Sequence, residues 1–455
     1  MIRGRARTLA TLTLVSGTFT SVLATTILYV PIDAIARDLR VSVPAASLVI
    51  TSASIAFATL LPIGGWLGNR FSRRDIFCLA VAAIGLAGLV AMAAHDLTTL
   101  VAMRVVQGAA AAAIVPVVMT LLKDVHEPQR HAFALGAWAT ANSLGQALGP
   151  PLGGLLASSW SWRAVFVPTA VLALLACLAA WRYVPPDPRR VAPLEWRGAL
   201  GLTLGALLLQ VAFAAIPQLG PGSPVIAVLT VLGILGLAAF GRAIRTTEHP
   251  FVSPRAFAEP SYVTSCIAVF ATTTAFGAAL VAIPLYLIQV RHFTTEAAGF
   301  ATFALPFAMA ICAPLTSAVI DRYGSRSAVR ASLVMMVVGA SAVALVVLRA
   351  ADLIALGASL LIVGAAVALS YTATAVGATE TKAGSYGAGV GLYNLMRISG
   401  LGVGAALVAI VLSRNGSAFA TIFVTCSLVV LGALVVTIVH GPATATGQRT
   451  TTSGN

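Results

Sequence analysis

Two arginines inside long apolar stretches are the residues of this chain best placed to act on a small molecule or on a proton. Arg104 begins the run Arg-Val-Val-Gln-Gly, which ends with Gln107 and Gly108, and Arg397 follows Asn394 at a spacing that puts both on one helix face. An ionised side chain within a membrane is costly, so it is expected to face the protein interior and to mark a functional site.

Each arginine also has a plainer interpretation. Arg104 lies about two helical turns from the end of its apolar stretch, so its side chain could extend to the membrane surface. Arg397 lies too deep for that, and it could instead bond to backbone carbonyl groups across a helix contact. Both the structural and the functional interpretation of Arg397 require it to face the protein interior.

Side-chain patterns of enzyme and metal sites are missing from the sequence. All five cysteines fall within apolar stretches without metal-ligand spacing, which indicates packing, and the six histidines lie at or near the ends of these stretches. Because no cluster of His, Asp and Ser suggests a catalytic site, we expect neither an enzyme nor a bound metal or cofactor.

The elements that hold these residues are expected to be membrane helices. Of 455 residues, 59% are hydrophobic and only 9% are charged, whereas a soluble domain has about 25% charged residues. A helix needs about 20 apolar residues to cross a bilayer, and stretches of that length recur along the whole chain. The fourteen expected spans are 8–32, 45–68, 76–94, 98–122, 132–157, 163–183, 198–217, 224–243, 261–288, 297–320, 328–348, 352–376, 386–412 and 417–440.

The distribution of basic residues predicts the orientation. The net charge of +14 would suggest a nucleic-acid partner for a soluble protein, but the apolar spans make the lipid bilayer the expected partner, and no nucleic acid. With the N-terminus inside, the expected cytoplasmic segments hold 20 Lys and Arg residues and the outer segments hold six, which follows the positive-inside rule. We therefore expect both termini in the cytoplasm. Arginine outnumbers lysine 26 to 2, which suggests a GC-rich genome and a bacterial inner membrane.

Weak internal repetition divides the chain into two related halves. At an offset near 252 residues, Asn142 aligns with Asn394 and Asn69-Arg70 aligns with Asp321-Arg322. Internal duplication is common in transporters. The expected organisation is a six-helix bundle at 1–184, an inserted helix pair with its loops at 185–258, a second six-helix bundle at 259–440 and a disordered cytoplasmic tail at 441–455.

The loop after the second expected span reads Gly64-Gly65-Trp66-Leu67-Gly68-Asn69-Arg70-Phe71-Ser72-Arg73-Arg74. It resembles the loop signature of the major facilitator superfamily, Gly-x-Leu-Ala-Asp-Arg-x-Gly-Arg-Lys, and the second half holds another copy. Asn69 stands where the family has an acid, so a polar acceptor remains there without the charge. Small residues let helix ends approach each other, and basic residues can bridge to helix C-termini, so the motif is suited to a gate. The alternative is that the basic loops only fix the topology. The expected gating residues are Gly65, Asn69, Arg70, Arg73, Asp321 and Arg322.

A glycine- and proline-rich run lies in the expected span 132–157. Gly145, Gly149 and Gly153 are four residues apart and line one helix face, which permits close packing. Pro150 and the proline after it are expected to bend or break the helix. Together with Gly154 the run resembles the antiporter motif of the drug/proton exporters in that superfamily, and generic packing of small residues is the alternative.

Essentially the whole chain resembles the fourteen-span drug/proton antiporter branch of the superfamily. The family has a similar Arg-x-x-Gln-Gly run assigned to proton transfer, which implies that role for Arg104, and it has a similar arginine in the span that holds Arg397. The resemblance implies two six-helix bundles, plus two inserted helices, that rock around a midplane cavity and exchange a drug for protons.

The match fails at the acid that usually binds the proton. That branch carries an aspartate in the first span, and alignment on Thr26 places it at Ala24. We expect none of the 14 Asp and Glu residues at mid-membrane depth. The nearest is Asp33, and we hypothesise that it pairs with Arg104 and that protonation breaks the pair. The alternatives are an Asp33 that caps a helix in solvent, and transport that is not driven by protons.

Because the only charges embedded in the expected spans are positive, we expect neutral, amphipathic or anionic substrates rather than lipophilic cations. The function that we expect is export of small amphipathic compounds, such as drugs or antibiotics, by a monomeric proton-coupled transporter. A metabolite importer or facilitator of the same fold, without proton coupling, is the alternative. The polar side chains expected to line the cavity are Tyr29, Gln107, Asn142, Gln146, Gln210, Tyr371 and Asn394.

Overall fold

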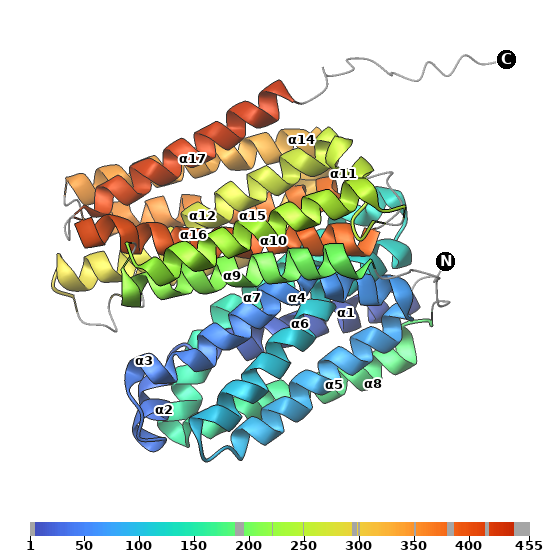
Figure 1. Ribbon diagram of the computed structural model, residues 1–455, viewed down its shortest axis with the longest axis horizontal. Helices are drawn as coiled ribbons and strands as arrows, with labels where there is room; N and C mark the ends of the chain where they lie inside the picture. The colour runs from blue at the N-terminus through green and yellow to red at the C-terminus, as the bar shows by residue number, and fades with distance from the viewer. Residues whose placement is uncertain are drawn as a thin grey trace.

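The computed structural model describes residues 5–186, 195–220, 222–248, 250–293, 298, 301–349, 352–379, 386–414 and 418–440. Regular structure within these ranges is entirely helical, which confirms the predicted all-α membrane fold (Figure 1). The tail predicted at 441–455 lies outside the described residues.

The long helices follow the expected spans, and short helices lie between some of them. Twelve of the described helices are long and apolar enough to cross a membrane. The 29-residue helix α7 is not among these twelve, and the 45-residue helix α14 is counted once. Counting α7 as a span and α14 as two would give fourteen spans, so the number fourteen stays a prediction. The helices are α1 (Arg5–Thr26), α2 (Ile32–Asp38), α3 (Val43–Ala46), α4 (Leu48–Arg70), α5 (Arg73–Met92), α6 (Leu97–Val125), η1 (Pro128–Arg130), α7 (His131–Ser159), η2 (Trp162–Val165), α8 (Phe166–Tyr183), α9 (Trp196–Leu219), α10 (Pro224–Thr246), α11 (Pro254–Ala258), α12 (Pro260–Gln289), α14 (Ala304–Leu348), α15 (Leu353–Thr379), α16 (Tyr386–Arg414) and α17 (Phe419–Val439).

Two of the boundaries differ from the expected spans. The span expected at 8–32 ends at Thr26, because Pro31 has no N–H with which to continue α1, and α2 follows after a turn. The spans expected at 297–320 and 328–348 are joined in α14, whose 45 residues would measure about 68 Å as one straight helix. Gly324 interrupts α14 with a φ of 80°, a conformation that glycine adopts without strain.

The long helices gather into two bundles (Figure 1). In the first bundle α4 packs against α6, α5 against α8 and α1 against α7, and in the second bundle α14 packs against α15 and α17, and α12 against α16. Large apolar side chains such as Leu174, Leu235 and Ile354 are exposed on the outside. An outer surface of this kind is suited to contact with lipid.

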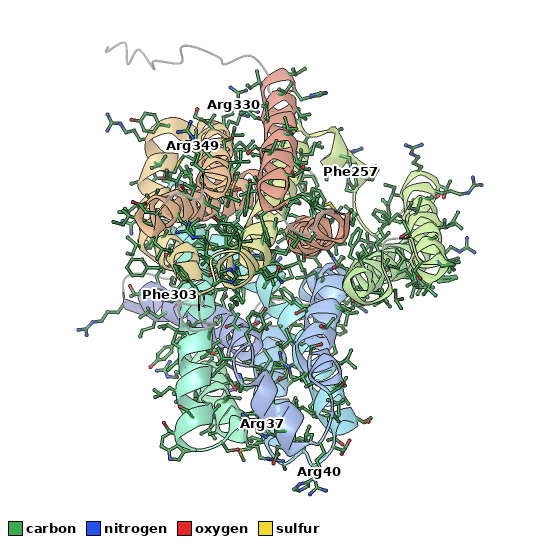
Figure 2. All side chains as sticks on the ribbon, turned by 90° about the vertical axis from the view of Figure 1, so that its left-hand side faces the viewer. Arg37, Arg40, Phe257, Phe303, Arg330 and Arg349 are labelled. Atoms are coloured by element: carbon green, nitrogen blue, oxygen red, sulfur yellow. The ribbon has the colours of Figure 1, made fainter. Side chains whose placement is uncertain are left out.

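The inserted helices α9 and α10 lie along the flank of the two bundles (Figure 2). The bundles meet through α4 with α16 and through α7 with α14, and α9 packs onto both α4 and α16. Leu202 of α9 belongs to one apolar cluster with Leu392 and Leu395 of α16, and Trp66 of α4 packs against that cluster. The inserted pair therefore covers one of the two seams between the bundles. The domain boundaries at 184, 258 and 440 stay predictions.

One end of the molecule, which we call the basic end, carries the loop between α4 and α5 and the loop between α6 and α7. The bundles approach each other towards this end and diverge towards the far end, where α2 and α3 lie (Figure 1). At the basic end Lys123 Nζ of α6 donates a hydrogen bond to the carbonyl oxygen of Thr379 in α15. A Cβ on Gly391 of α16 would lie 2.6 Å from the carbonyl oxygen of Leu61 in α4. Only glycine allows this approach.

Candidate functional site

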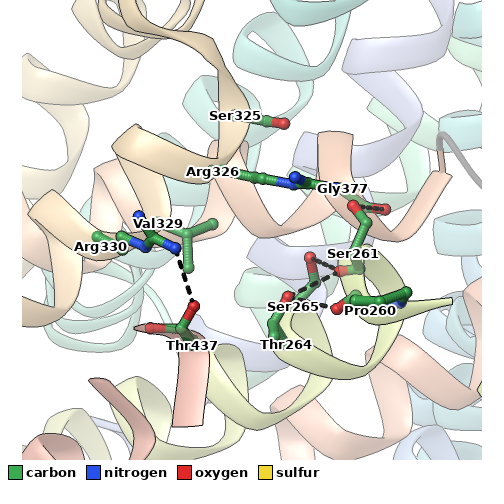
Figure 3. Close-up of a pocket in the computed structure, with 10 residues that line it drawn as sticks. All are labelled: Pro260, Ser261, Thr264, Ser265, Ser325, Arg326, Val329, Arg330, Gly377 and Thr437. Carbon is green, nitrogen blue, oxygen red and sulfur yellow. Dashed lines mark hydrogen bonds between the residues drawn. The ribbon is translucent and has the colours of Figure 1, made fainter. Parts of the chain in front are cut away.

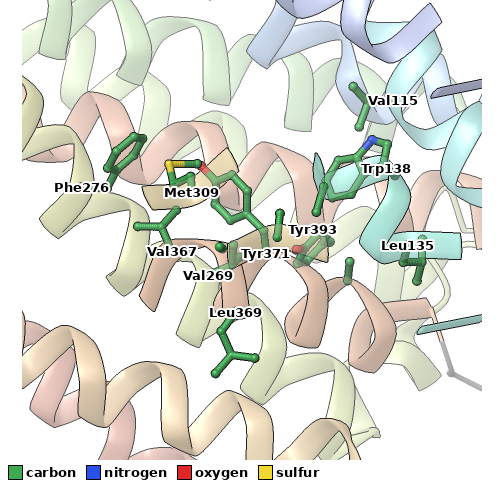
Figure 4. Packing of buried hydrophobic residues seen from close by; sticks show 14 of the residues in the cluster. Val115, Leu135, Trp138, Val269, Phe276, Met309, Val367, Leu369, Tyr371 and Tyr393 are labelled. Carbon is green, nitrogen blue, oxygen red and sulfur yellow. The ribbon is translucent and has the colours of Figure 1, made fainter. Parts of the chain in front are cut away.

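Arg397 of α16 is buried where the second bundle meets the first. The residue is 2% exposed, and its Nε donates to Oδ1 of Asn394 at 3.2 Å. Its guanidinium carbon lies 5.0 Å from the ring centre of Tyr371 in α15 and 5.5 Å from that of Trp138 in α7, which is a cation–π arrangement. These four residues, which we call the Arg397 site, include Trp138 from the first bundle (Figure 4). The site therefore joins both bundles.

The Arg397 site has a free donor and no acid. Among the described residues no carboxylate lies within 4.0 Å of Arg397, and Nε1 of Trp138 has no hydrogen-bond partner. Asn394 Nδ2 donates to the carbonyl oxygen of Val390 at 2.9 Å and lies 3.4 Å from Sδ of Met119 in α6. A buried charge without a counter-ion is costly. The site is therefore suited to a compound that brings an anionic or strongly polar group on an aromatic or apolar body.

Arg104 of α6 points into the first bundle rather than to the membrane surface. It is 1% exposed and donates from Nε to the carbonyl oxygen of Val49 at 3.0 Å. Its Nη1 donates to the carbonyl oxygen of Ala24 at 2.8 Å and to Oε1 of Gln107 at 2.7 Å, whereas Nη2 has no partner among the described residues. Gln107 Nε2 in turn donates to the carbonyl oxygen of Ile84 at 3.1 Å. The arginine thus joins α1, α4, α5 and α6.

The predicted pairing of Asp33 with Arg104 stays a prediction. Asp33 belongs to α2, but its side chain lies outside the described part of the structure, so its pairing with Arg104 has no test here. Ala24, the position aligned with the acid of the antiporter branch, is buried and offers Arg104 only its carbonyl oxygen. The described carboxylates Asp75, Asp124 and Glu195 all lie at helix ends.

The glycine face of α7 lies against α1. A Cβ on Gly149 would lie 2.0 Å from Oγ1 of Thr26, and a Cβ on Gly153 would lie 1.8 Å from the carbonyl oxygen of Ile27. Thr26 Oγ1 donates to the carbonyl oxygen of Gly145 at 2.9 Å. The predicted close packing is therefore present, and it fixes α1 beside α7.

The two prolines of this motif do not break the helix. Pro150 and Pro151 lie inside α7, which runs from His131 to Ser159. The expected break is therefore not found. Each proline removes one hydrogen-bond donor, and the contact of the flanking glycines with α1 holds the helix on both sides of the pair.

Adjacent glycines of the motif give a matched test of this packing. We expect Gly153→Ala to destabilise the folded protein by about 2 kcal/mol, because its methyl group would overlap the backbone of Ile27, directly after α1. Gly154→Ala should be nearly neutral, since its nearest contact is the side chain of Val30, which is 52% exposed, at 3.3 Å. Thermal unfolding of the two purified variants checks this, and equal unfolding temperatures would contradict the role assigned to Gly153.

The loop between α4 and α5 is fastened within the first bundle. Arg73 is buried and pairs through Nη1 with Oδ2 of Asp124 near the end of α6. A Cβ on Gly68 would lie 2.7 Å from Cγ2 of Val117, so the end of α4 also lies closely on α6. Asp124 was not among the predicted residues. Its position next to Lys123, at the end of an apolar span, is the signal that could have identified it.

The other predicted gating residues are placed as follows. Gly65 is buried in α4, Asn69 is half-buried, and the guanidinium carbon of Arg70 lies 5.9 Å from the ring centre of Phe71. In the second copy, Asp321 and Arg322 are exposed in α14 just before Gly324. The structure does not test whether these residues gate.

The remaining polar residues predicted for the cavity lie in separate places. Asn142 of α7 is buried and accepts a hydrogen bond from Nε2 of Gln146 at 2.6 Å. Gln210 of α9 donates to Oγ of Ser399 in α16 at 2.9 Å, so it lies at the contact of the inserted pair. Tyr29 lies in the turn after α1 and is 47% exposed.

An ion pair fastens α2 at the far end. Asp38 Oδ2 accepts from Nη1 of Arg163 at 2.5 Å and from Nε1 of Trp162 at 3.0 Å, and these two hydrogen bonds hold the pKa of Asp38 below its ordinary value. A lowered pKa stabilises the fold above the ordinary aspartate pKa of about 3.9, and this contribution is lost as the pH falls through the lower, folded-state pKa.

Thermal unfolding of the wild type and of Asp38→Asn measures that contribution. We expect the variant to be less stable at pH 6, and the two unfolding temperatures to converge below about pH 4. A difference that persists unchanged at the lowest pH would show that the charge of Asp38 does not matter.

The architecture defines a class of protein. Two bundles of membrane-length helices that approach at one end, and that share a buried arginine, are the architecture of a secondary transporter. The sequence model described as Major Facilitator Superfamily matches residues 14–253 and 265–454. This chain belongs to the major facilitator superfamily, and it is a multi-pass membrane protein of a transporter family, as predicted.

Similar proteins in bacteria are named for export and resistance. The chain is 30% identical over 326 residues to the multidrug export protein EmrB of Haemophilus influenzae, covering 71% of this chain and 63% of that protein. It is 36% identical over 239 residues to the puromycin resistance protein pur8 of Streptomyces alboniger, covering 51% and 46%. It is 26% identical over 328 residues to the fatty acid resistance protein FarB of Neisseria gonorrhoeae, covering 71% and 64%. The matches thus span between about half and two thirds of these relatives.

Solved transporters share the fold. The human organic anion transporter MFSD10 superposes with a TM-score of 0.71 at 17% identity, over 96% of this chain and 100% of that one. The proton:xylose symporter XylE superposes with a TM-score of 0.67 at 14% identity, over 94% of each chain. These likenesses confirm the predicted major-facilitator fold.

Proposed function

We propose that this protein exports small amphipathic compounds, drugs or antibiotics among them, by alternating access of its two bundles. The observation that carries the proposal is the Arg397 site, in which one buried cation is enclosed by aromatic rings from both bundles. A compound bound there would contact both bundles, so its binding free energy could depend on their relative position, as alternating access requires. The names of the bacterial relatives support export.

The chemistry of the site favours anionic or neutral amphipathic cargo over cations. Arg397 and Arg104 are buried well inside the described spans, and no carboxylate lies within 4.0 Å of either among the described residues, whereas the buried Arg73 at the start of α5 pairs with Asp124. A carboxylate on the cargo would gain charge-assisted hydrogen bonds from Arg397. A lipophilic cation would be repelled there.

The positive-inside rule supports a cytoplasmic basic end, with both termini inside a bacterial inner membrane. In that orientation the bundles are close on the cytoplasmic side and diverge towards the outside, which is the geometry of an outward-facing transporter. We propose that the protein works as a monomer in lipid.

Proton coupling is the further part of the proposal. Arg104 lies between backbone carbonyl acceptors of α1 and α4, and a protonatable group near it would feel its charge. Asp33 is the candidate for that group, and deprotonated Asp33 would pair with Arg104.

Inverted membrane vesicles test the function directly. Energised vesicles with an acidic interior should accumulate an amphipathic acid and a neutral amphipathic antibiotic, and collapse of the pH gradient should abolish the accumulation. Uptake by intact cells instead would support the alternative importer, and accumulation that survives loss of the gradient would contradict proton coupling.

Asp33→Asn tests the proposed proton site in the same vesicles. We expect the gradient-driven component of accumulation to fall at least tenfold, because an amide cannot exchange a proton in this pH range. Asp96→Asn is the control, since Asp96 is an exposed cap of α6 at the far end, where it accepts from the N–H of Thr99 at 2.8 Å, and asparagine caps equally well. Full gradient-driven transport by Asp33→Asn would exclude Asp33 as the coupling residue.

A further inference from the structure

A pocket lined by two arginines lies at the basic end of the second bundle. It is lined by the start of α12, the part of α14 after Gly324, and the ends of α15 and α17 (Figure 3). The pocket is open to solvent, and its enclosed part is small. We call it the Arg326–Arg330 pocket. Its lining residue Gly377 lies six residues, about 9 Å along α15, from Tyr371 of the Arg397 site.

The two arginines of the pocket face no acid. Arg330 Nη2 donates to the carbonyl oxygen of Thr437 in α17 at 3.2 Å, and Arg326 extends across the pocket towards Ser261 and Gly377 (Figure 3). No carboxylate of the described residues lies within 4.0 Å of either guanidinium group. Glu259 precedes α12 but is not a lining residue. Guanidinium groups bind phosphate through paired, charge-assisted hydrogen bonds, so the pair is suited to a phosphate.

The opposite wall is the first turn of α12, whose helix dipole favours an anion. Ser261, Thr264 and Ser265 line the pocket, and their hydroxyl groups already donate to the carbonyl oxygens of Gly377, Pro260 and Ser261, in that order. The N-terminus of this 30-residue helix carries the positive end of the helix dipole, while the N–H groups of Tyr262 and Val263 already donate to the carbonyl oxygen of Glu259. Gly377 lets α15 approach this turn, since a Cβ there would lie 2.4 Å from Oγ of Ser265.

The surface beside the pocket distinguishes a lipid from a soluble anion. Ile438 and Val439 follow the lining residue Thr437 on α17 and are 55% and 70% exposed, and Val334 of α14 is 48% exposed. Such side chains contact the acyl chains of a bilayer. A phosphate in the pocket would therefore lie at the level of the headgroups, with the apolar side chain of Val334 about one turn deeper in the membrane than Arg330.

We propose that the Arg326–Arg330 pocket binds a phosphate group and that the headgroup of an anionic phospholipid supplies it. Basic pockets between membrane helices on the cytoplasmic side attract anionic headgroups. The headgroup would contact α12, α14, α15 and α17 together, so it would hold the basic end of the second bundle in one arrangement.

Native mass spectrometry of the detergent-purified full chain tests the proposal. The probe is phosphatidylglycerol, with zwitterionic phosphatidylcholine as the comparison lipid and inorganic phosphate as the soluble competitor. We expect the double variant Arg326→Gln/Arg330→Gln to raise the apparent Kd for phosphatidylglycerol about twentyfold, from the loss of two arginine–phosphate contacts. The matched control is Arg242→Gln/Arg245→Gln, which removes two exposed arginines from α10 at the same end. The single variant Arg326→Gln leaves the bond from Arg330 to Thr437 intact and should raise the Kd about fivefold.

The outcomes separate the two parts of the proposal. An unchanged Kd in both the double and the single variant, or an equal loss in the control pair, would overturn the site. Displacement of phosphatidylglycerol by millimolar inorganic phosphate would overturn the lipid as its source. The site would be established if phosphatidylglycerol binds the control pair as it binds the wild type and binds both pocket variants more weakly. The size-exclusion profiles of all these variants should be unchanged.

Discussion

Arg397→Gln should lower the kcat/KM for transport of an amphipathic acid about 100-fold. Glutamine keeps a hydrogen-bond donor but removes the charge and the cation–π contacts to Trp138 and Tyr371. Removal of one partner of a desolvated charge pair commonly costs 2–5 kcal/mol, and about 2.7 kcal/mol corresponds to 100-fold. Initial rates of uptake into proteoliposomes measure the change.

The control for this variant is Arg349→Gln. Arg349 is an exposed arginine that ends α14 at the far end, and its removal lowers the net charge equally. We expect its kcat/KM to stay within about twofold of the wild type, well under 1 kcal/mol. If both variants lose the same activity, the effect comes from total charge and the Arg397 site has no special role.

The second large effect is expected for Arg104→Leu, and it falls on stability. Arg104 Nη1 satisfies the carbonyl oxygen of Ala24, which lies in the last turn of α1 where helix carbonyl groups lack intrahelical partners. Leucine would leave that group, and Oε1 of Gln107, unsatisfied in the protein interior at roughly 1–3 kcal/mol each. We expect a loss of about 4 kcal/mol in folding stability and a correspondingly low yield of folded protein.

Thermal unfolding in detergent measures this loss. Val105→Leu is the matched control, because Val105 is the next residue and its side chain is 41% exposed. Arg104→Lys should be intermediate, since one ammonium group cannot reach α1, α4 and Gln107 together. An unfolding temperature of Arg104→Leu equal to that of the control would show that Arg104 does not join these helices.

Much of the fold could be predicted because apolar length and charge dictate it. The spans around α5, α6 and α8 followed from their apolar length, and the small residues of α7 predicted close packing against a neighbouring helix, which the structure identifies as α1. The break after Thr26 was missed, although Pro31 was visible, because the apolar run continues through Ile32. The joining of the two spans in α14 depends on the φ of Gly324, a property of the folded backbone that no periodicity reveals.

The candidate site could be predicted in part. The cost of a buried charge predicted that Arg397 and Arg104 would face the interior, and both do. Trp138 was missed, because an aromatic residue in an apolar span carries no signal of its own; its position four residues before Asn142 placed it on the same face. The carbonyl partners of Arg104 could not be predicted, since backbone acceptors are the same at every residue. Gln210 was expected in the cavity, and it lies against Ser399 because the sequence does not define where the inserted pair docks.

The central claim is that the buried charge of Arg397 selects the cargo. Uptake into proteoliposomes of an amphipathic carboxylic acid and of its uncharged methyl ester, by the wild type and by Arg397→Gln, tests it most directly. We expect the wild type to prefer the acid at least tenfold and the variant to transport the two compounds at similar rates. A wild type that favours the ester or a lipophilic cation, or a variant that keeps the full preference for the acid, would contradict the account.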